Sequence, residues 1–240
     1  MQRLYLHSEL RGWANKETIR HGAVKLGCLV VETDRLIDVP EKKGHIMYGG
    51  VSFVHKFIER EGLQVQRLGD VPECLMDFAG RKIELMTLKD ALKEKFRFIK
   101  PISEYQKEFT GFVYRAPVDL LNIANYDENW LVHVSEYVSF LSEYRVFVHK
   151  REVIGAKHYK GSFRVIPDIE VADKILKNWP SDYPSSFSID LGLTTAGDTL
   201  LVECNDVMSL GWYGFEETYA AAMLVDRWEQ IHKQNGVNVE

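Results

Sequence analysis

Two carboxylates and an amide supply hard oxygen ligands near the ends of two short apolar runs. Asp190 closes one run, and Glu203 follows the run 200–202, with Asn205 shortly after it. A turn at 196–198 would join these runs as neighbouring strands. Glu203 and Asn205 would then share one face of the hairpin, with Asp190 across from them, because side chains alternate along a strand. By itself this pattern fits a Mg²⁺ site beside a substrate phosphate and a hairpin with solvated carboxylates equally well.

Positive charge is concentrated within segment 145–164, although the chain as a whole carries a net charge of −5. Lys150 and Arg151 occupy the tip of an expected hairpin, where charged side chains are usually solvated. Lys157 and Lys160 lie farther along the second strand of that hairpin. They can project from a sheet toward an anionic ligand.

The composition defines the class of protein that must position these side chains. The chain has 240 residues, of which 45% are hydrophobic and 27% are charged, as in a globular protein of one large or two small domains. No apolar run is long enough for a bilayer, and the N-terminal residues are too polar for a signal peptide. We therefore expect a cytoplasmic protein without a membrane partner. The mild negative charge argues against general nucleic-acid binding.

The cysteines do not form a recognisable framework. Cys28, Cys74 and Cys204 are odd in number and far apart in the sequence. Neither a set of disulfides nor a zinc site follows from that spacing, so reduced thiols are expected.

The first part of the chain alternates strand and helix patterns, which predicts a small parallel sheet with flanking helices. Gly49 and Gly50 precede the second helix and favour a tight turn over a phosphate cradle. The expected strands are 3–6, 28–32 and 45–48. The expected helices are one capped by Asn15, with Ile19, Ala23 and Leu26 on its apolar face and Gly27 at its end, and one carrying Val54, Phe57 and Ile58 and closed by Gly62.

Beyond Thr87 the pattern becomes antiparallel and aromatic. Thr87 with Asp90 resembles a capping box that opens a helix. We expect a domain boundary at 85–95, with a small α/β domain at 1–90 and a second domain at 91–240. The expected strands are 96–100, 109–114, 130–138, 144–149 and 153–159, and the expected helices are 88–95, 118–124, 169–179 and a C-terminal helix with Ala221, Leu224, Val225, Trp228 and Ile231 on one face.

Five short segments in a fixed order carry a resemblance to a known family. They are FIKP at 98–101, VSEYV at 134–138, EYRVFV at 143–148, SIDLG at 188–192 and VECND at 202–206. Together they resemble the ordered signatures of the ATP-grasp superfamily over about half of the chain, residues 96–212. More narrowly, Arg145 with Lys157 and Lys160 resembles a small clade of phage and bacterial ATP-grasp proteins noted for one arginine and two lysines.

The resemblance implies a fold and a set of roles. The fold is an α/β N-terminal domain followed by α+β ATP-grasp lobes, with antiparallel sheets and helices and with ATP held between a small lobe at about 96–136 and a C-terminal lobe at 137–240. The implied roles are phosphate contact for Lys100, adenine recognition at the hinge Glu136, Tyr137 and Val138, ribose contact for Glu143, Mg²⁺ ligation for Asp190, Glu203 and Asn205, and catalysis for Arg145, Lys157 and Lys160.

Two features depart from the superfamily pattern. The phosphate-covering loop is usually rich in glycine, but between Pro101 and Val113 only Gly111 is present. The chain is also short, so elements that bind the acceptor substrate are expected to be trimmed or supplied by a partner. Segment 209–214 follows the metal strand and could form the floor of an acceptor pocket or simply pack Trp212 into the core.

The implied activity is ATP- and Mg²⁺-dependent ligation of a carboxylate to an amine through an acylphosphate, with a small molecule, peptide or protein as substrate. The alternatives are a phosphoryl transferase on the same scaffold and a non-catalytic ATP-binding regulatory module. The retained metal trio and Arg145 argue against the binding module, because a sensor does not need to stabilise charge during transfer. A nucleic-acid ligase is disfavoured because no lysine nucleophile motif is present.

Overall fold

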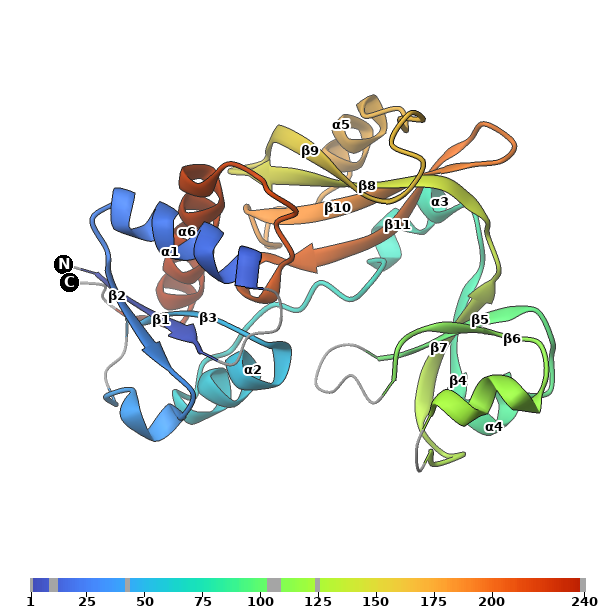
Figure 1. Ribbon diagram of the computed structural model, residues 1–240, viewed down its shortest axis with the longest axis horizontal. Coiled ribbons are helices and arrows are strands. Elements are labelled where there is room, and N and C mark those ends of the chain that lie inside the picture. The colour runs from blue at the N-terminus through green and yellow to red at the C-terminus, as the bar shows by residue number, and fades with distance from the viewer. Residues whose placement is uncertain (1, 9–12, 42–43, 103–108, 124–125, 238–240) are drawn as a thin grey trace.

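The computed structural model describes residues 2–8, 13–41, 44–102, 109–123 and 126–237. Its strands form three sheets: one of three strands and two of four. Figure 1 shows the N-terminal sheet at one end of the long axis, the small lobe with β4 to β7 at the other, and the large sheet with β8 to β11 spanning the space between them. The fold class expected from the sequence, an α/β part followed by antiparallel α+β lobes, is confirmed.

The N-terminal sheet is parallel, as expected. Its order is β2-β1-β3, from β1 (Arg3–His7), β2 (Leu29–Thr33) and β3 (Ile46–Tyr48). The central strand is buried on both faces, which explains the unbroken apolar run at 4–6. Helices α1 (Trp13–Lys25) and α2 (Val51–Arg60) and the 3₁₀ helix η1 (Leu36–Asp38) accompany the sheet. Gly27 and Gly62 follow the two α-helices with φ of 79° and 64°, a left-handed conformation that glycine adopts without strain.

Two expectations for α1 were wrong. The helix begins at Trp13, so Asn15 lies inside its first turn, and the Asn15 Oδ1 atom instead accepts a hydrogen bond of 2.8 Å from the backbone nitrogen of Trp212. Leu26 lies beyond the helix end and is 42% exposed. A tertiary contact to a distant loop therefore uses the side chain that local sequence reasoning assigned to capping.

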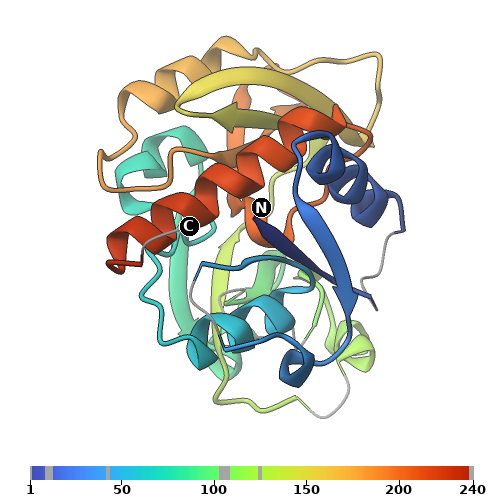
Figure 2. The same ribbon diagram turned by 90° about the vertical axis from the view of Figure 1, so that its left-hand side faces the viewer.

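The C-terminal helix completes the N-terminal part of the molecule. α6 (Glu217–Gln234) buries Ala221, Leu224, Trp228 and Ile231 as expected, and Val225 is partly buried. One core cluster joins residues 4–63 to residues 207–237. Figure 2 shows α6, in red, alongside the blue N-terminal strands. Gly22 permits this approach, because a Cβ atom there would overlap the carbonyl of Glu217. The division into domains at residue 90 stays a prediction.

The small lobe is built on an antiparallel sheet of order β4-β7-β5-β6. Its strands are β4 (Ile83–Thr87), which the sequence pattern had not revealed, β5 (Arg97–Pro101), β6 (Phe112–Tyr114) and β7 (Leu131–Glu136). Ile99, Val132 and Val134 pack on one face against α4 (Leu88–Ala91) and the 3₁₀ helix η3 (Pro117–Asn122). The opposite face carries Lys100 and His133 in register.

Several expected elements of the small lobe are shorter than their sequence patterns. Thr87 does cap α4, with its Oγ1 accepting from the backbone nitrogen of Asp90, but the helix ends at Ala91 rather than 95. Residues 93–95 are exposed and give the helix no further apolar face to bury. The helix expected at 118–124 is a 3₁₀ helix, and residue 124 lies outside the described part. The strands expected at 109–114 and 130–138 are confined to β6 and β7.

The large sheet has the order β11-β10-β8-β9 and is antiparallel throughout. Its strands are β8 (Phe140–His149), β9 (Glu152–Gly161), β10 (Phe187–Thr194) and β11 (Thr199–Asp206), with α5 (Glu170–Lys177) packed on one face. Both expected hairpins are confirmed. Lys150 and Arg151 form the first tip with φ of 50° and 67°, and Gly197 lies in the second with φ of 94°.

Short helices join these parts of the chain. The 3₁₀ helix η2 (Glu73–Leu75) and α3 (Met76–Ala79) precede β4, and the 3₁₀ helix η4 (Val207–Ser209) follows β11. The three cysteines are free thiols, as expected, and Cys28 and Cys204 are buried. Within the described ranges, no helix has the length and apolar character needed to cross a membrane.

The contact between α6 and the N-terminal sheet predicts a pH-dependent stability. His232 is 1% exposed, and burial, with a smaller contribution from His45, lowers its pKa to about 4. A histidine in the unfolded chain takes up a proton near pH 6.5, so the folded state should lose stability as the pH falls from about 7 toward 4, by at most about 3 kcal/mol from this residue. His232→Gln should flatten the dependence in urea unfolding followed between pH 7 and pH 4.5.

His21→Gln is the control for this prediction, because His21 lies on α1 with a side chain that is 54% exposed. It should leave the loss of stability at low pH in place. An equally steep loss in His232→Gln would contradict the role given to the buried imidazole.

Candidate functional site

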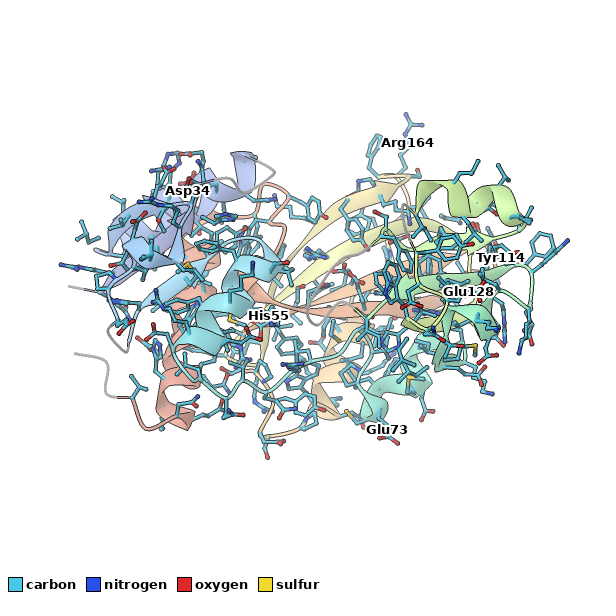
Figure 3. All side chains as sticks on the ribbon, turned by 90° about the horizontal axis from the view of Figure 1, so that it is seen from below. Asp34, His55, Glu73, Tyr114, Glu128 and Arg164 are labelled. Atoms are coloured by element: carbon cyan, nitrogen blue, oxygen red, sulfur yellow. The ribbon has the colours of Figure 1, made fainter. Side chains whose placement is uncertain are left out.

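A cavity of about 1000 Å³ lies between the open face of the small-lobe sheet and the face of the large sheet opposite α5. Its walls come from α2, the connector 62–71, β5, β7 and the strands of the large sheet, and the loop 208–213 contributes one side. In Figure 3, His55 of α2 lies between Asp34 at one end of the molecule and Glu128 at the other. The cavity therefore gathers residues from widely separated parts of the chain.

The strand register brings the carboxylates together at this cavity. Asp190 of β10 is paired with Glu203 of β11 on one side and with Arg145 of β8 on the other. The expected position of Asp190 across from Glu203 is thus confirmed. Asn205 lies two positions along β11, and its amide nitrogen donates to Glu203 Oε1 at 3.2 Å.

Arg145 holds the most deeply buried of these carboxylates. Its Nε and Nη2 atoms donate to the two oxygens of Asp190 at 2.8 and 2.7 Å, while Nη1 donates to the carbonyl of Gly211 at 3.0 Å. The guanidinium carbon lies 5.7 Å from the ring centre of Tyr159 and 5.3 Å from that of Tyr213. Every nitrogen of the guanidinium is therefore engaged, and its faces meet aromatic rings.

The two carboxyl groups are shifted in opposite directions. Asp190 is 1% exposed, and its burial raises its pKa to about 6 in spite of the Arg145 guanidinium. Burial also opposes the charge of Glu203, but the Lys100 ammonium, with help from Arg145, outweighs it and lowers the pKa of Glu203 to about 2. Both groups are ionised at pH 7, so the cavity wall presents two negative charges.

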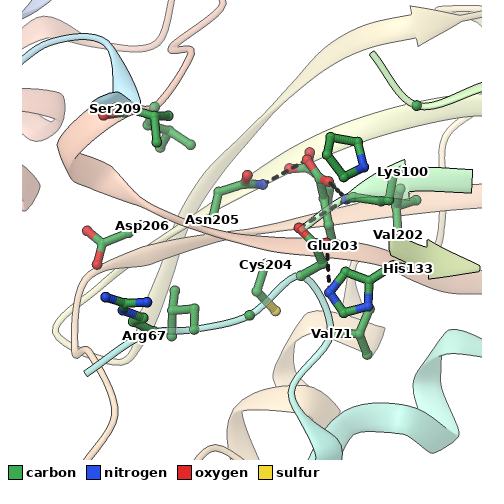
Figure 4. A pocket seen from close by; sticks show the side chains of 18 of the residues that line it. Arg67, Val71, Lys100, His133, Val202, Glu203, Cys204, Asn205, Asp206 and Ser209 are labelled. Atoms are coloured by element: carbon green, nitrogen blue, oxygen red, sulfur yellow. Dashed lines mark hydrogen bonds and ion pairs between the residues drawn. The ribbon is translucent and has the colours of Figure 1, made fainter. Parts of the chain in front are cut away.

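Lys100 spans the cavity from the small lobe. Its Nζ atom lies 2.9 Å from Glu203 Oε2 and 3.0 Å from Asp70 Oδ1. Figure 4 shows Lys100 reaching toward Glu203, with His133 beside them. Burial disfavours the ammonium, but the charges of Glu203 and then Asp70 exceed this effect and raise the pKa of Lys100. Lys100 is therefore a cation held between two acids.

A second carboxylate is committed to neighbours on β9. Glu143 is 5% exposed; its Oε2 atom accepts from the Tyr159 hydroxyl at 2.7 Å and its Oε1 atom from Lys160 Nζ at 2.5 Å. Burial and then the carboxylates of Asp190 and Glu143 raise the pKa of Tyr159, so its hydroxyl stays protonated and donates. The geometry places Lys160 beside Glu143, where the sequence resemblance implied ribose binding.

The link between β7 and β8 also lines the cavity, and it connects the two four-stranded sheets. Glu136, Tyr137 and Val138 lie there, as expected for a hinge. The Glu136 Oε2 atom accepts a hydrogen bond of 2.8 Å from the backbone nitrogen of Lys82, and the Tyr137 side chain is 53% exposed. The backbone of this link is thus placed beside the cavity by strands on both sides.

One expected catalytic residue stands apart. Lys157 pairs with Arg145 in the β8–β9 register but does not line the cavity. Segment 209–214 fits both interpretations, because Ser209, Gly211 and Tyr213 line the cavity while Trp212 is fully buried. The sequence-selected residues that line the cavity are Lys100, Glu136, Tyr137, Val138, Glu143, Arg145, Lys160, Asp190, Glu203 and Asn205.

Sequence reasoning missed several residues of the site. Asp70 lies in a connector without periodicity, and Tyr159 reaches Glu143 next to a bulge in the β8–β9 pairing. Arg81 donates to the carbonyls of Leu201 and Val202 at 2.8 and 2.9 Å, and its burial lowers its pKa. An isolated Asp after Gly69, or an isolated Arg after Gly80, gives no signal of such tertiary contacts.

The oxygen ligands in the cavity suit a divalent cation that shares a phosphate-bearing ligand. Among the described residues, no group of three His, Cys, Asp or Glu side chains could hold a metal ion by itself. Asp190, Glu203 and Asn205 offer two carboxylates and an amide oxygen, and Mg²⁺ is commonly held by one or two carboxylates together with substrate phosphates. The donor set therefore fits Mg²⁺ delivered with a nucleotide.

Comparison with solved structures supports the fold. A RimK domain ATP-grasp protein from Sphaerobacter thermophilus aligns with a TM-score of 0.61 at 14% identity, covering 95% of this chain and 99% of that one. D-alanine–D-alanine ligase from Bacillus anthracis aligns with a TM-score of 0.55 at 11% identity, covering 98% and 100%. The macrocyclase MdnC from Microcystis aeruginosa, bound with precursor peptide MdnA, aligns with a TM-score of 0.53 at 9% identity, covering 93% and 99%.

Sequence comparison gives the family. No curated protein sequence matches the chain. A family model of the ATP-grasp domain, for family 2 of the clade named after one arginine and two lysines, matches residues 78–223. The match covers more than half of the chain and includes Arg145, Asp190 and Glu203. The protein belongs to this clade of the ATP-grasp superfamily.

Proposed function

We propose that this protein is an ATP- and Mg²⁺-dependent ligase that joins a carboxylate to an amine. The observation that carries the proposal is the pairing of cations with carboxylates across the cavity, Lys100 with Glu203 and Arg145 with Asp190. Phosphoryl transfer depends on positioning and on stabilising negative charge, and it needs cations and metal-binding oxygens in one cleft. This cleft contains both.

The proposed nucleotide position follows the walls of the cavity. Lys100 would contact the phosphates, the backbone at Glu136–Tyr137–Val138 would face the adenine edge, and Glu143 would accept from the ribose hydroxyls. Asp190, Glu203 and Asn205 would hold Mg²⁺, which supplies charge neutralisation to the terminal phosphates when bound. The raised pKa of Lys100 supports its part, because the ammonium keeps its charge in a partly buried position.

The proposed chemistry begins with attack of the substrate carboxylate on the γ-phosphate, giving an acylphosphate and ADP. The amine then attacks the acyl carbon, forms the amide bond and expels phosphate. Arg145 and Lys160 are the cations nearest to the space left beside the proposed nucleotide, and Lys157 is assigned a supporting part from the family resemblance alone. Among proteins of the same fold are a D-alanine–D-alanine ligase and a macrocyclase bound with a precursor peptide, which supports small-molecule and peptide substrates as the classes to test.

The first prediction concerns the metal ligands. Glu203→Gln removes one charge from the proposed Mg²⁺ site and should raise the Kd of Mg·ATP by about tenfold or more, the scale of a lost charge-assisted contact. Isothermal titration calorimetry in the presence of Mg²⁺ measures this effect. The matched control is Glu128→Gln, because Glu128 is exposed and outside the cavity. Equal affinity in both variants would remove Glu203 from the metal site.

The second prediction concerns Arg145. Arg145→Ala leaves the Asp190 carboxylate buried without its partner, so we expect a loss of about 3 kcal/mol or more in unfolding free energy. Arg145→Lys keeps a charge beside Asp190 but cannot form both bonds of the guanidinium fork. It should fold and bind Mg·ATP, while its turnover falls by about 10³. Normal turnover by Arg145→Lys would show that the guanidinium is needed only for the fold.

The third prediction tests the reaction class. Amino acids and peptides, offered in pairs as carboxylate and amine, should stimulate ADP release and give a product whose mass equals the two substrates less one water. Coupled detection of ADP with mass spectrometry measures both. Binding of Mg·ATP without stimulated ADP release across a broad panel would support a binding module, and a phosphorylated product would support a phosphoryl transferase.

A further inference from the structure

Lys100 has a second acidic partner that the proposed nucleotide site does not use. Asp70 Oδ1 lies 3.0 Å from Lys100 Nζ, almost as close as the Glu203 oxygen at 2.9 Å. Asp70 belongs to the connector between α2 and the small lobe, Glu203 to the large sheet and Lys100 to the small-lobe sheet. One ammonium thus joins three separate parts of the chain.

The backbone of Asp70 is fixed to the large sheet. Its carbonyl accepts a hydrogen bond of 2.6 Å from the nitrogen of Cys204, at the free edge of β11. On either side, Leu68 is buried in the core beneath the large sheet and Val71 packs against that core. Gly69, with φ of 59°, turns the chain between them. Asp70 is therefore a rigidly placed carboxylate beside Glu203.

The small lobe supplies the other half of the contact. Lys100 pairs with His133 in the β5–β7 register, and the His133 Nε2 atom lies 3.8 Å from Asp70 Oδ2. The side chains of Asp70 and Lys100 are 15% and 20% exposed. Water competes little for a charge-assisted bond in such a place, so the contact is stronger than a pair on the open surface.

We propose that Asp70 is a positioning residue that holds Lys100 at the phosphates when Mg·ATP occupies the cavity; this inference rests on the proposed function. Glu203 is assigned to Mg²⁺, so the metal competes with Lys100 for its oxygens. Asp70 is not assigned to the metal and remains the anchor of a side chain with a long flexible stem. The negative charge of Asp70 by itself repels phosphate, so the sign of its effect separates positioning from simple electrostatics.

The test is calorimetric titration of the full-length protein with Mg·ATP. Asp70→Asn should raise the Kd by about tenfold, the scale of one lost hydrogen bond to a charged group. In a Lys100→Ala background the same substitution should have no further effect, because the residue it positions is gone. Asp70→Glu keeps the carboxylate and should bind more tightly than Asp70→Asn. Asp77→Asn, on the outer side of α3 and away from the cavity, is the matched control and should bind as the wild type does.

Three results would overturn the inference. An unchanged or lower Kd in Asp70→Asn, with the wild-type melting temperature, would show that the charge is neutral or opposed to binding. Equal losses in the wild-type and Lys100→Ala backgrounds would show that Asp70 does not act through Lys100. Failure of the wild type to bind Mg·ATP would overturn the proposed function and this inference together, whereas the first two results leave the proposed function intact.

Discussion

The buried carboxylate of Asp190 is the constraint on which the rest of the site depends, because an ionised group with almost no contact with water must be neutralised by a precisely placed partner. Arg145 meets this need through two hydrogen bonds, and the antiparallel register of β8 and β10 puts the two residues opposite one another. The remaining nitrogen of the guanidinium holds the carbonyl of Gly211. A Cβ at that glycine would lie 3.4 Å from the guanidinium, so a small residue keeps the loop close. One ion pair thereby orders two strands, a loop and the edge of the cavity.

The second organising contact crosses the cavity. Lys100 extends from a sheet whose apolar face is already covered by α4 and η3, so its polar face is left for the cleft. It meets Glu203 on the large sheet and Asp70 on the connector. The N-terminal sheet and α6 close the far end, and their shared core makes the first and last parts of the chain a single support. Charge is thus concentrated where the separately supported sheets approach, which is the arrangement that binding of a polyanion with a metal requires.

Local patterns predicted those parts of the molecule that are determined locally. Alternation and turn residues were enough to place Asp190 across from Glu203 and Lys150 at a hairpin tip, and helix periodicity was enough to identify the buried face of α6. The ordered motifs of the family added Lys100 and Glu143, whose positions on the cavity wall agree with the expectation. What failed depends on tertiary contacts. Asn15 bonds to a loop almost two hundred positions away, α4 stops where burial stops, and Asp70 meets Lys100 only after three parts of the chain have packed together. No periodicity within a short window contains that information.

The central claim is that the facing charges of the small lobe and the large sheet form the site for a metal-bound nucleotide. A crystal structure of the protein with Mg²⁺ and a non-hydrolysable ATP analogue tests it most directly. The account predicts phosphates within hydrogen-bond distance of Lys100, the metal on oxygens of Asp190, Glu203 or Asn205, and the adenine beside the link that contains Tyr137. A nucleotide bound elsewhere on the molecule, or one in this cavity whose phosphates point away from Lys100 and Glu203, would contradict it.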